Sequence, residues 1–372
     1  MALCVGATGC QQQIRRPAEF GPCYPPAPHT PRIQHLRSFT GGSDFIVEGG
    51  GLWRRLFGGS AEAGSDLLKP HGLAARDGRL YVCDAGRGAI FVFDFAGGSF
   101  DRWEHSGIRL SKPVALRITD TGELQVCDAG LGAVVRFAPD GRLAGLVDLA
   151  ALREASSGAG IPDKFIPISI TDGPDGHAAV LNRAAHRIEL IEPATGHHAG
   201  SWSGPGSGPD HLYFPAAAAG GPGGTVWCVD RMNRHVLALA PDGSVAARFG
   251  EAGDQPGYLN QPRGIAADQH GVIYLTDAGL PGIQLFDRDG TFLTGFGYPG
   301  DPGPAVVLPA GICLDRSCLP YFAELIRPGF AAEYLIFVAD QLGPHRIHVY
   351  AFGTGATAPS EPRATALARR PG

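Results

Sequence analysis

Six prolines recur along the chain at nearly constant spacing, and each one opens a short apolar segment. The successive steps between them are 43, 54, 48, 47 and 47 residues, and the set is Pro70, Pro113, Pro167, Pro215, Pro262 and Pro309. The segments 56–72, 248–264 and 295–311 align without gaps, each running from Phe-Gly through a glycine-rich loop to Pro-x-Gly. A repeat of this length built of short strands is typical of β-propeller blades.

Each unit has a second landmark, an apolar run that stops at an acidic residue. The acids are Asp84, Asp128, Asp230, Asp277 and Asp340, and Asn182 takes their place in the third unit. Because the acid recurs once per unit, directly after a strand, we expect each carboxylate to accept backbone N–H groups and to fix a turn. A catalytic ring of acids is the alternative that this regularity disfavours.

A further strand follows each acid, and an Asp-Gly pair then predicts a hairpin in three units. These pairs, Asp140-Gly141, Asp242-Gly243 and Asp289-Gly290, are typical of type I′ turns. Four strands per unit and six units predict an all-β fold over residues 30–353, a six-bladed β-propeller of four-stranded blades. The 55 glycines and 31 prolines among 372 residues suit many tight turns.

Charge and hydropathy exclude some classes of function. The formal net charge is −5, so we expect no nucleic acid among the partners, since a general polyanion binder needs a basic face. No run of eighteen apolar residues occurs, which predicts that no transmembrane helix is present.

Three stretches resemble the NHL repeat: 232–236 (Met-Asn-Arg-His-Val), 262–268 (Pro-Arg-Gly-Ile-Ala-Ala-Asp) and 289–293 (Asp-Gly-Thr-Phe-Leu). The resemblance covers roughly residues 30–353. It is weaker in the third unit and departs most in the sixth, where 316–333 are inserted between the first two predicted strands. It implies a six-bladed propeller that works by presenting a binding surface.

The two ends of the chain differ from the repeats. Residues 32–41 read like the end of a blade, so we expect them to supply the outer strand of blade six and close the ring. Residues 1–29 are predicted to be a leader and a proline-rich tether, and residues 354–372 a disordered tail.

The leader contains a Gly-Cys pair similar to the end of a truncated bacterial lipoprotein signal, with Cys10 as the candidate for lipidation. A plain disordered leader is the alternative. The whole leader is similar to that of NHL lipoproteins encoded beside multihaem cytochromes in metal-reducing bacteria. This resemblance implies a cell-envelope or periplasmic location with a lipid anchor, and a cytoplasmic location stays open.

The residue after each blade proline is a candidate site position. The resemblance implies that it begins the innermost strand, near the mouth of the central channel. His71 and Arg263 occupy it in two units, where they could recognise an anion. A zinc site needs about three protein ligands, and His71 is the one histidine at this position. A calcium-dependent lactonase needs converging Glu, Asn and Asp, a set that the sequence does not assemble. We therefore predict neither a cofactor nor a bound metal.

Besides Cys10, four of the eight cysteines lead to specific predictions. Cys83 and Cys127 hold equivalent positions in neighbouring units, too far apart for a disulfide, so we expect small buried hydrophobic residues. Cys313 and Cys318 are close in sequence and could form a disulfide in an oxidising compartment, with two free thiols as the alternative.

The leading functional prediction is a monomeric, non-enzymatic protein-binding or scaffold propeller of the bacterial cell envelope. Its partner would be a protein such as an envelope cytochrome or a secretion component. The insertion, with Tyr321, Phe322 and Phe330, is the candidate contact, and a purely structural elaboration is its alternative. The runner-up function is a metal-dependent propeller hydrolase or lyase, lactonase-like, with an ion on the axis.

Overall fold

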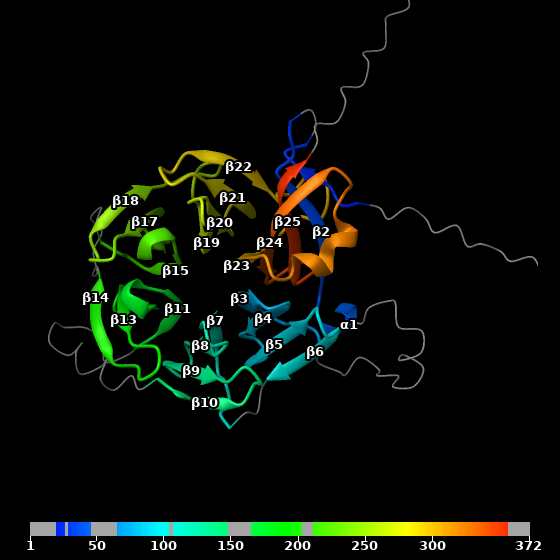
Figure 1. Ribbon diagram of the computed structural model, residues 1–372. Coiled ribbons are helices and arrows are strands. Elements are labelled where there is room, and N and C mark those ends of the chain that lie inside the picture. The colour runs from blue at the N-terminus through cyan, green and yellow to red at the C-terminus, as the bar shows by residue number, and fades with distance from the viewer. Residues whose placement is uncertain are drawn as a thin grey trace, which may run out of the picture.

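The computed structural model describes residues 20–26, 29–45, 65–103, 107–147, 165–202 and 211–355. Within them, strands form six antiparallel sheets that stand as blades around a central axis (Figure 1), which confirms the predicted six-bladed β-propeller. Among the described residues, no helix is long and apolar enough to cross a membrane.

Five blades consist of four consecutive strands each. Blade one contains β3 (Pro70–Arg76), β4 (Arg79–Asp84), β5 (Ala89–Asp94) and β6 (Ser99–Trp103). Blade two contains β7 (Pro113–Ile118), β8 (Leu124–Asp128), β9 (Ala133–Phe137) and β10 (Leu143–Leu146). Blade three contains β11 (Pro167–Asp172), β12 (Ala178–Asn182), β13 (Arg187–Ile191) and β14 (His198–Trp202). Blade four contains β15 (Pro215–Gly220), β16 (Val226–Asp230), β17 (His235–Leu239) and β18 (Val245–Phe249). Blade five contains β19 (Pro262–Ala267), β20 (Ile273–Asp277), β21 (Gly282–Phe286) and β22 (Phe292–Phe296).

Blade six joins the two ends of the described chain. Its strands, from the axis outward, are β23 (Pro309–Asp315), β24 (Phe330–Asp340), β25 (Ile347–Gly355), β2 (Ile33–Phe39) and β1 (Cys23–Tyr24). The short helices lie between strands: α1 (Gly42–Phe45), η1 (Pro174–Gly176), η2 (Pro222–Gly224) and η3 (Leu319–Leu325).

The repeated prolines and acids occupy the same positions in every blade and form the same contacts. Each proline is the first residue of an innermost strand, and its strand partner is the acid that ends the next strand, as in Pro70 opposite Asp84. The buried Asp84 carboxylate accepts backbone N–H groups from residues 68, 69, 86 and 87 at 2.6–3.2 Å. Asp128, Asp230, Asp277, Asp340 and Asn182 accept equivalent bonds. The predicted structural role of these acids is confirmed.

The glycine of the Pro-x-Gly motif lets neighbouring blades approach each other at the axis. A Cβ atom on Gly311 would lie 2.1 Å from the carbonyl oxygen of His71, and one on Gly264 would lie 2.2 Å from that of Ala310. No side chain fits at either place, so glycine keeps the innermost strands of blades five, six and one in contact.

The predicted type I′ turns are wrong. In the three Asp-Gly pairs the glycine alone has a positive φ, 83–85°, and in the first hairpin Gly141 N donates to the Ala138 carbonyl at 2.9 Å. This pattern is a type I turn followed by a left-handed glycine. It forms a hairpin loop that is longer than the two-residue loop of a type I′ turn. Positive φ at both residues is found instead at Asp77-Gly78 (52° and 76°), between β3 and β4.

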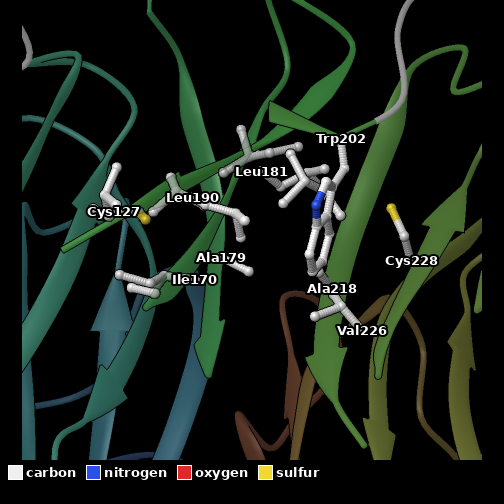
Figure 2. Close-up of a cluster of buried hydrophobic side chains, with 14 of the residues drawn as sticks. Cys127, Ile170, Ala179, Leu181, Leu190, Trp202, Ala218, Val226 and Cys228 are labelled. Carbon is white, nitrogen blue, oxygen red and sulfur yellow. The ribbon is translucent and has the colours of Figure 1, made fainter. Parts of the chain in front are cut away.

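Apolar side chains from adjacent blades form the core. Figure 2 shows one such cluster, in which Cys127 of blade two, Trp202 of blade three and Cys228 of blade four lie among Leu and Val side chains. Cys83 is likewise fully buried. Burial raises the pKa of all three thiols well above the usual value. The prediction that Cys83 and Cys127 act as small hydrophobic residues is confirmed.

The N-terminal segment closes the ring, as predicted. Strand β2 pairs antiparallel with β25, from Ile33 opposite Phe352 to Phe39 opposite Ile347. Two details differ from the prediction: residues 23–24, assigned to the tether, form a fifth strand, and β25 extends to Gly355. Side-chain burial explains the first difference, because Tyr24 is buried in the core with Ile33.

A histidine cluster at this closure predicts acid sensitivity. Ser38 Oγ lies 2.9 Å from both His35 Nε2 and His348 Nδ1. Burial and the neighbouring His348 and His345 lower the pKa of His35 to about 4. The unfolded chain, with an ordinary histidine pKa near 6.5, therefore binds the proton more readily, and stability is lost as the pH falls from about 6.5 to about 4.

Between pH 7 and pH 4, we expect the free energy of unfolding to fall by about 3 kcal/mol less in the His35→Gln variant than in the wild type. Urea unfolding at pH 7 and pH 4 measures the difference, with the exposed His29→Gln as the control. Equal pH dependence in His35→Gln and the wild type would show that His35 titrates normally.

Candidate functional site

The central channel is a cavity of about 390 Å³, and all six innermost strands line it. At the end where these strands begin, a second cavity of about 200 Å³ forms the channel mouth. The residues that precede the blade prolines and those that follow the capping acids surround this mouth, because each proline pairs with its acid there. We call this end of the propeller the mouth face and the opposite end the far face.

His71 and Arg263 both line the mouth, so the structure brings the two predicted residues together. Four more cationic side chains join them. These are Lys69 of blade one, Lys112 of blade two, Arg183 of blade three and Arg231 of blade four. Among the described residues, no Asp or Glu lines the mouth. Sequence reasoning missed the four additional cations, although two simple signals marked them: both lysines directly precede a blade proline, and both arginines directly follow a capping residue.

Neutral groups orient the arginines of the mouth. Arg263 donates to Gln341 Oε1 at 2.9 Å, and the buried Gln341 donates to the Pro70 carbonyl at 3.0 Å, next to His71. Arg231 donates to Gln261 Oε1 at 3.0 Å, and the Arg183 guanidinium lies 5.9 Å from the Phe214 ring centre. Within the described part of the chain, none of the five cations forms an ion pair. Hydrogen bonds and a ring contact therefore orient the three arginines without a direct ion pair.

The field of these cations acts on the histidine between them. Burial, Arg263, Lys112 and Lys69 lower the pKa of His71 to about 4. Burial and the nearby Arg231 also lower the pKa of Arg263. At neutral pH the imidazole of His71 is therefore uncharged and sits among five positive groups. Such a concave positive site attracts anions.

On the far face, several cations form ion pairs with acids. Arg117 forms an ion pair with Asp172 at the far end of the channel, Arg79 pairs with Asp94 at 2.9 Å, and Arg76 lies 3.5 Å from Asp77. These pairs contrast with the mouth, where Arg263, Arg231 and Arg183 have neutral partners.

Exposed apolar side chains also concentrate on the mouth face. Of the eleven large hydrophobic side chains that are exposed in the described residues, eight lie in its loops: Leu68, Leu131, Tyr213, Phe214, Met232, Tyr258, Val307 and Leu342. Leu146, Leu293 and Tyr321 lie elsewhere. Contiguous apolar surface around a polar centre marks interaction sites more often than scattered residues do.

The residues of the channel do not suit an axial metal ion. The described residues contain no group of three His, Cys, Asp or Glu side chains placed to hold a metal. One carboxylate, Asp172, lines the channel, and it already pairs with Arg117. A divalent cation at the mouth would face five positive charges with a single imidazole as a ligand.

Two of the three residues predicted to form a contact on the insertion are not exposed. Phe322 and Phe330 are buried, and Phe322 packs on Phe95 of blade one and Phe337 of β24. Gln34 of the closing strand donates to the Leu325 carbonyl at 2.9 Å and accepts from Arg327 N at 3.0 Å. Tyr321 is exposed but lies against Gly78 on the far face. The insertion is therefore a structural elaboration that covers the closing strand.

The predicted disulfide is absent, since Cys313 and Cys318 are both free. Both thiols pack in the apolar cluster of blades six and one, and burial raises the pKa of each. This packing agrees with the alternative prediction, that Cys313 and Cys318 are two free thiols. Cys10, the lipidation candidate, lies outside the described residues.

Comparison with known proteins places the fold but not the activity. Residues 67–93 match the NHL repeat, and no curated protein matches the sequence. The chain is similar to a gluconolactonase from Xanthomonas campestris, with 14% identity and a TM-score of 0.56 over 92% of this chain and 99% of that one. It is similar to virginiamycin B lyase from Staphylococcus aureus, with 14% identity and a TM-score of 0.52 over 77% and 95% of the two chains. A chain of the nidogen/laminin complex gives 17% identity and a TM-score of 0.50 over 66% and 84%. At these identities the likeness shows the fold alone.

Proposed function

We propose that this protein is a non-enzymatic binding and scaffold module of the bacterial cell envelope, which docks a protein partner on its mouth face. The observation that carries the proposal is the composition of that face, where cations line the channel mouth and exposed apolar side chains lie in the loops of the same face. Burying apolar side chains at a protein interface supplies affinity, and the cations select a partner with an acidic surface.

Several features support binding rather than catalysis. The repeated acids, which a hydrolase could have used, are engaged as caps by backbone N–H groups. The channel residues do not suit the axial ion of the lactonase-like alternative. The envelope setting rests on the Gly-Cys leader in the sequence, and a lipid anchor at Cys10 would hold the propeller at a membrane. A cytochrome or a secretion component with an acidic patch is the kind of partner that this face fits.

Exposed apolar residues provide a matched test of the docking face. Met232 and Leu342 on the mouth face are 58% and 53% exposed, and Leu146 and Leu293 on outer strands are 51% and 50% exposed. We expect the double variant Met232→Asp/Leu342→Asp to lose at least 90% of the partner that the wild type retains from envelope extracts. Introducing a carboxylate there removes apolar contact and opposes the acidic partner.

The variant Leu146→Asp/Leu293→Asp should retain the same partner at wild-type levels, with thermal midpoints of both variants close to the wild type. Quantitative mass spectrometry of the bound fractions measures the effect. Loss of the partner from the outer-strand variant, or equal recovery by all three proteins, would place docking elsewhere on the molecule.

A further inference from the structure

The mouth of the channel gathers positive side chains from several blades. Five cations from five consecutive blades line a cavity of about 200 Å³, and no carboxylate of the described residues lines it. Other arginines of the described chain do pair with acids, among them Arg136 with Glu123 at 2.6 Å and Arg187 with Glu189 at 2.7 Å. Of the three lysines in the whole sequence, two lie at this mouth. Gathering like charges without partners opposes folding, so the arrangement indicates a ligand that supplies the missing negative charge.

A buried glutamine holds the central arginine of the mouth in a fixed orientation. Gln341 is 4% exposed, and its amide links the Arg263 guanidinium to the Pro70 carbonyl. This contact fixes the guanidinium beside His71, and among the described residues its other nitrogens form no hydrogen bond. Lys69 and Lys112, which are exposed, can reach the same opening from two neighbouring blades. A planar guanidinium with a fixed orientation and mobile ammonium groups around it is a suitable receptor for carboxylate or phosphate oxygens.

We propose that the channel mouth binds a multivalent oxyanion, a polycarboxylate or a phosphate, with Arg263 as the central donor and Lys69, Lys112 and Arg231 around it. The small cavity suits such a group, because pockets for larger organic ligands usually measure about 300–1,000 Å³. His71 would contact the anion as a neutral donor at pH 7. The inference concerns the same face as the proposed function but needs no protein partner, so the two can fail independently.

Isothermal titration calorimetry with citrate, inorganic phosphate and a hexaglutamate peptide tests the site at about 20 mM salt, where screening is weak. We expect binding of citrate and of at least one other probe, weakened at least tenfold in Arg263→Gln and in Lys112→Gln. Lys112 is exposed, so its substitution leaves the fold intact. The control Arg142→Gln removes an exposed arginine that pairs with Asp140 in an outer hairpin, and it should bind like the wild type.

Nuclear magnetic resonance of the histidines gives a second readout. Bound oxyanion should raise the pKa of His71 from about 4, because negative charge favours the imidazolium. The resonances of the exposed His270 serve as the reference signal. Tighter binding of hexaglutamate would identify acidic side chains of a partner as the source of the anion, and tighter binding of citrate would identify a free polycarboxylate. Absence of binding by all three probes, or undiminished binding in both Arg263→Gln and Lys112→Gln, would overturn the proposal.

Discussion

Replacing Asp84 by alanine is expected to lower the free energy of unfolding by about 4 kcal/mol, one of the largest effects that a single substitution can have in this chain. The carboxylate is fully buried and accepts backbone N–H groups on both sides of the blade end. Alanine leaves these donors without a partner in a place that water does not reach. Urea-induced unfolding followed by circular dichroism measures the loss.

Asp84→Asn is the informative comparison, because the protein already uses asparagine at this position in blade three. There, Asn182 Oδ1 accepts from the backbone of residues 166, 184 and 185 at 3.2–3.4 Å, longer than the bonds of Asp84. We therefore expect Asp84→Asn to cost about 1–2 kcal/mol, clearly less than alanine. If alanine and asparagine were equally costly, or if alanine cost under 1 kcal/mol, the capping role would be refuted.

Removal of the closing strand should have a comparably large effect. A protein that lacks residues 1–40 loses β1 and β2, and with them the burial of Ile33 and Phe39 and the pairing to β25. The edge of β25 is then open, and blade six has three strands. We expect the thermal midpoint to fall by more than about 10 °C relative to a protein that lacks only residues 1–19.

A point variant and a peptide keep this prediction testable if the shortened protein does not fold. Ile33→Ala in the full chain should cost about 3 kcal/mol, since Ile33 is fully buried. A synthetic peptide of residues 20–41 should raise the thermal midpoint of the shortened protein. Equal midpoints for the two truncations would show that the ring is stable without the N-terminal strand.

The blades could be predicted from the sequence because their landmarks are local. Each blade proline presets the backbone at the start of a strand, and each capping acid satisfies N–H groups a fixed distance away. The same reasoning located β2, because residues 32–41 repeat the pattern of a blade end. The turn type at Asp140-Gly141 was missed, because the sequence pair is the same for a two-residue loop and for a longer loop with a left-handed glycine.

The candidate site was only partly predictable, because it is assembled from several blades. His71 and Arg263 were found through their position after the blade proline. Lys112 and Arg231 were missed, since their convergence depends on the ring bringing residues before the prolines and after the acids to one mouth. The aromatic residues of the insertion were misjudged for the reverse reason: a break in the repeat indicates a binding loop, but Phe322 and Phe330 fill the gap between blades one and six.

The mouth face contains residues that the propeller fold itself does not require. A propeller needs its prolines, capping acids and buried strands, but it does not need Lys69, Lys112 or Arg231 at the channel, nor exposed Met232 and Leu342 beside them. These residues add little to the apolar core. Without a partner, the exposed apolar side chains and the like charges on this face are energetically unfavourable. A partner with an acidic and apolar contact surface would neutralise the cations and cover the apolar side chains.

Site-specific photo-crosslinking tests the docking face most directly. A photoreactive phenylalanine analogue is placed at Met232 on the mouth face, at Tyr321 on the far face and at Leu293 on an outer strand, and the cells that naturally produce the protein are irradiated. We predict a discrete protein adduct from position 232 and none from positions 293 and 321. An adduct from position 321 or 293 with none from position 232 would contradict the assignment of function to the mouth face.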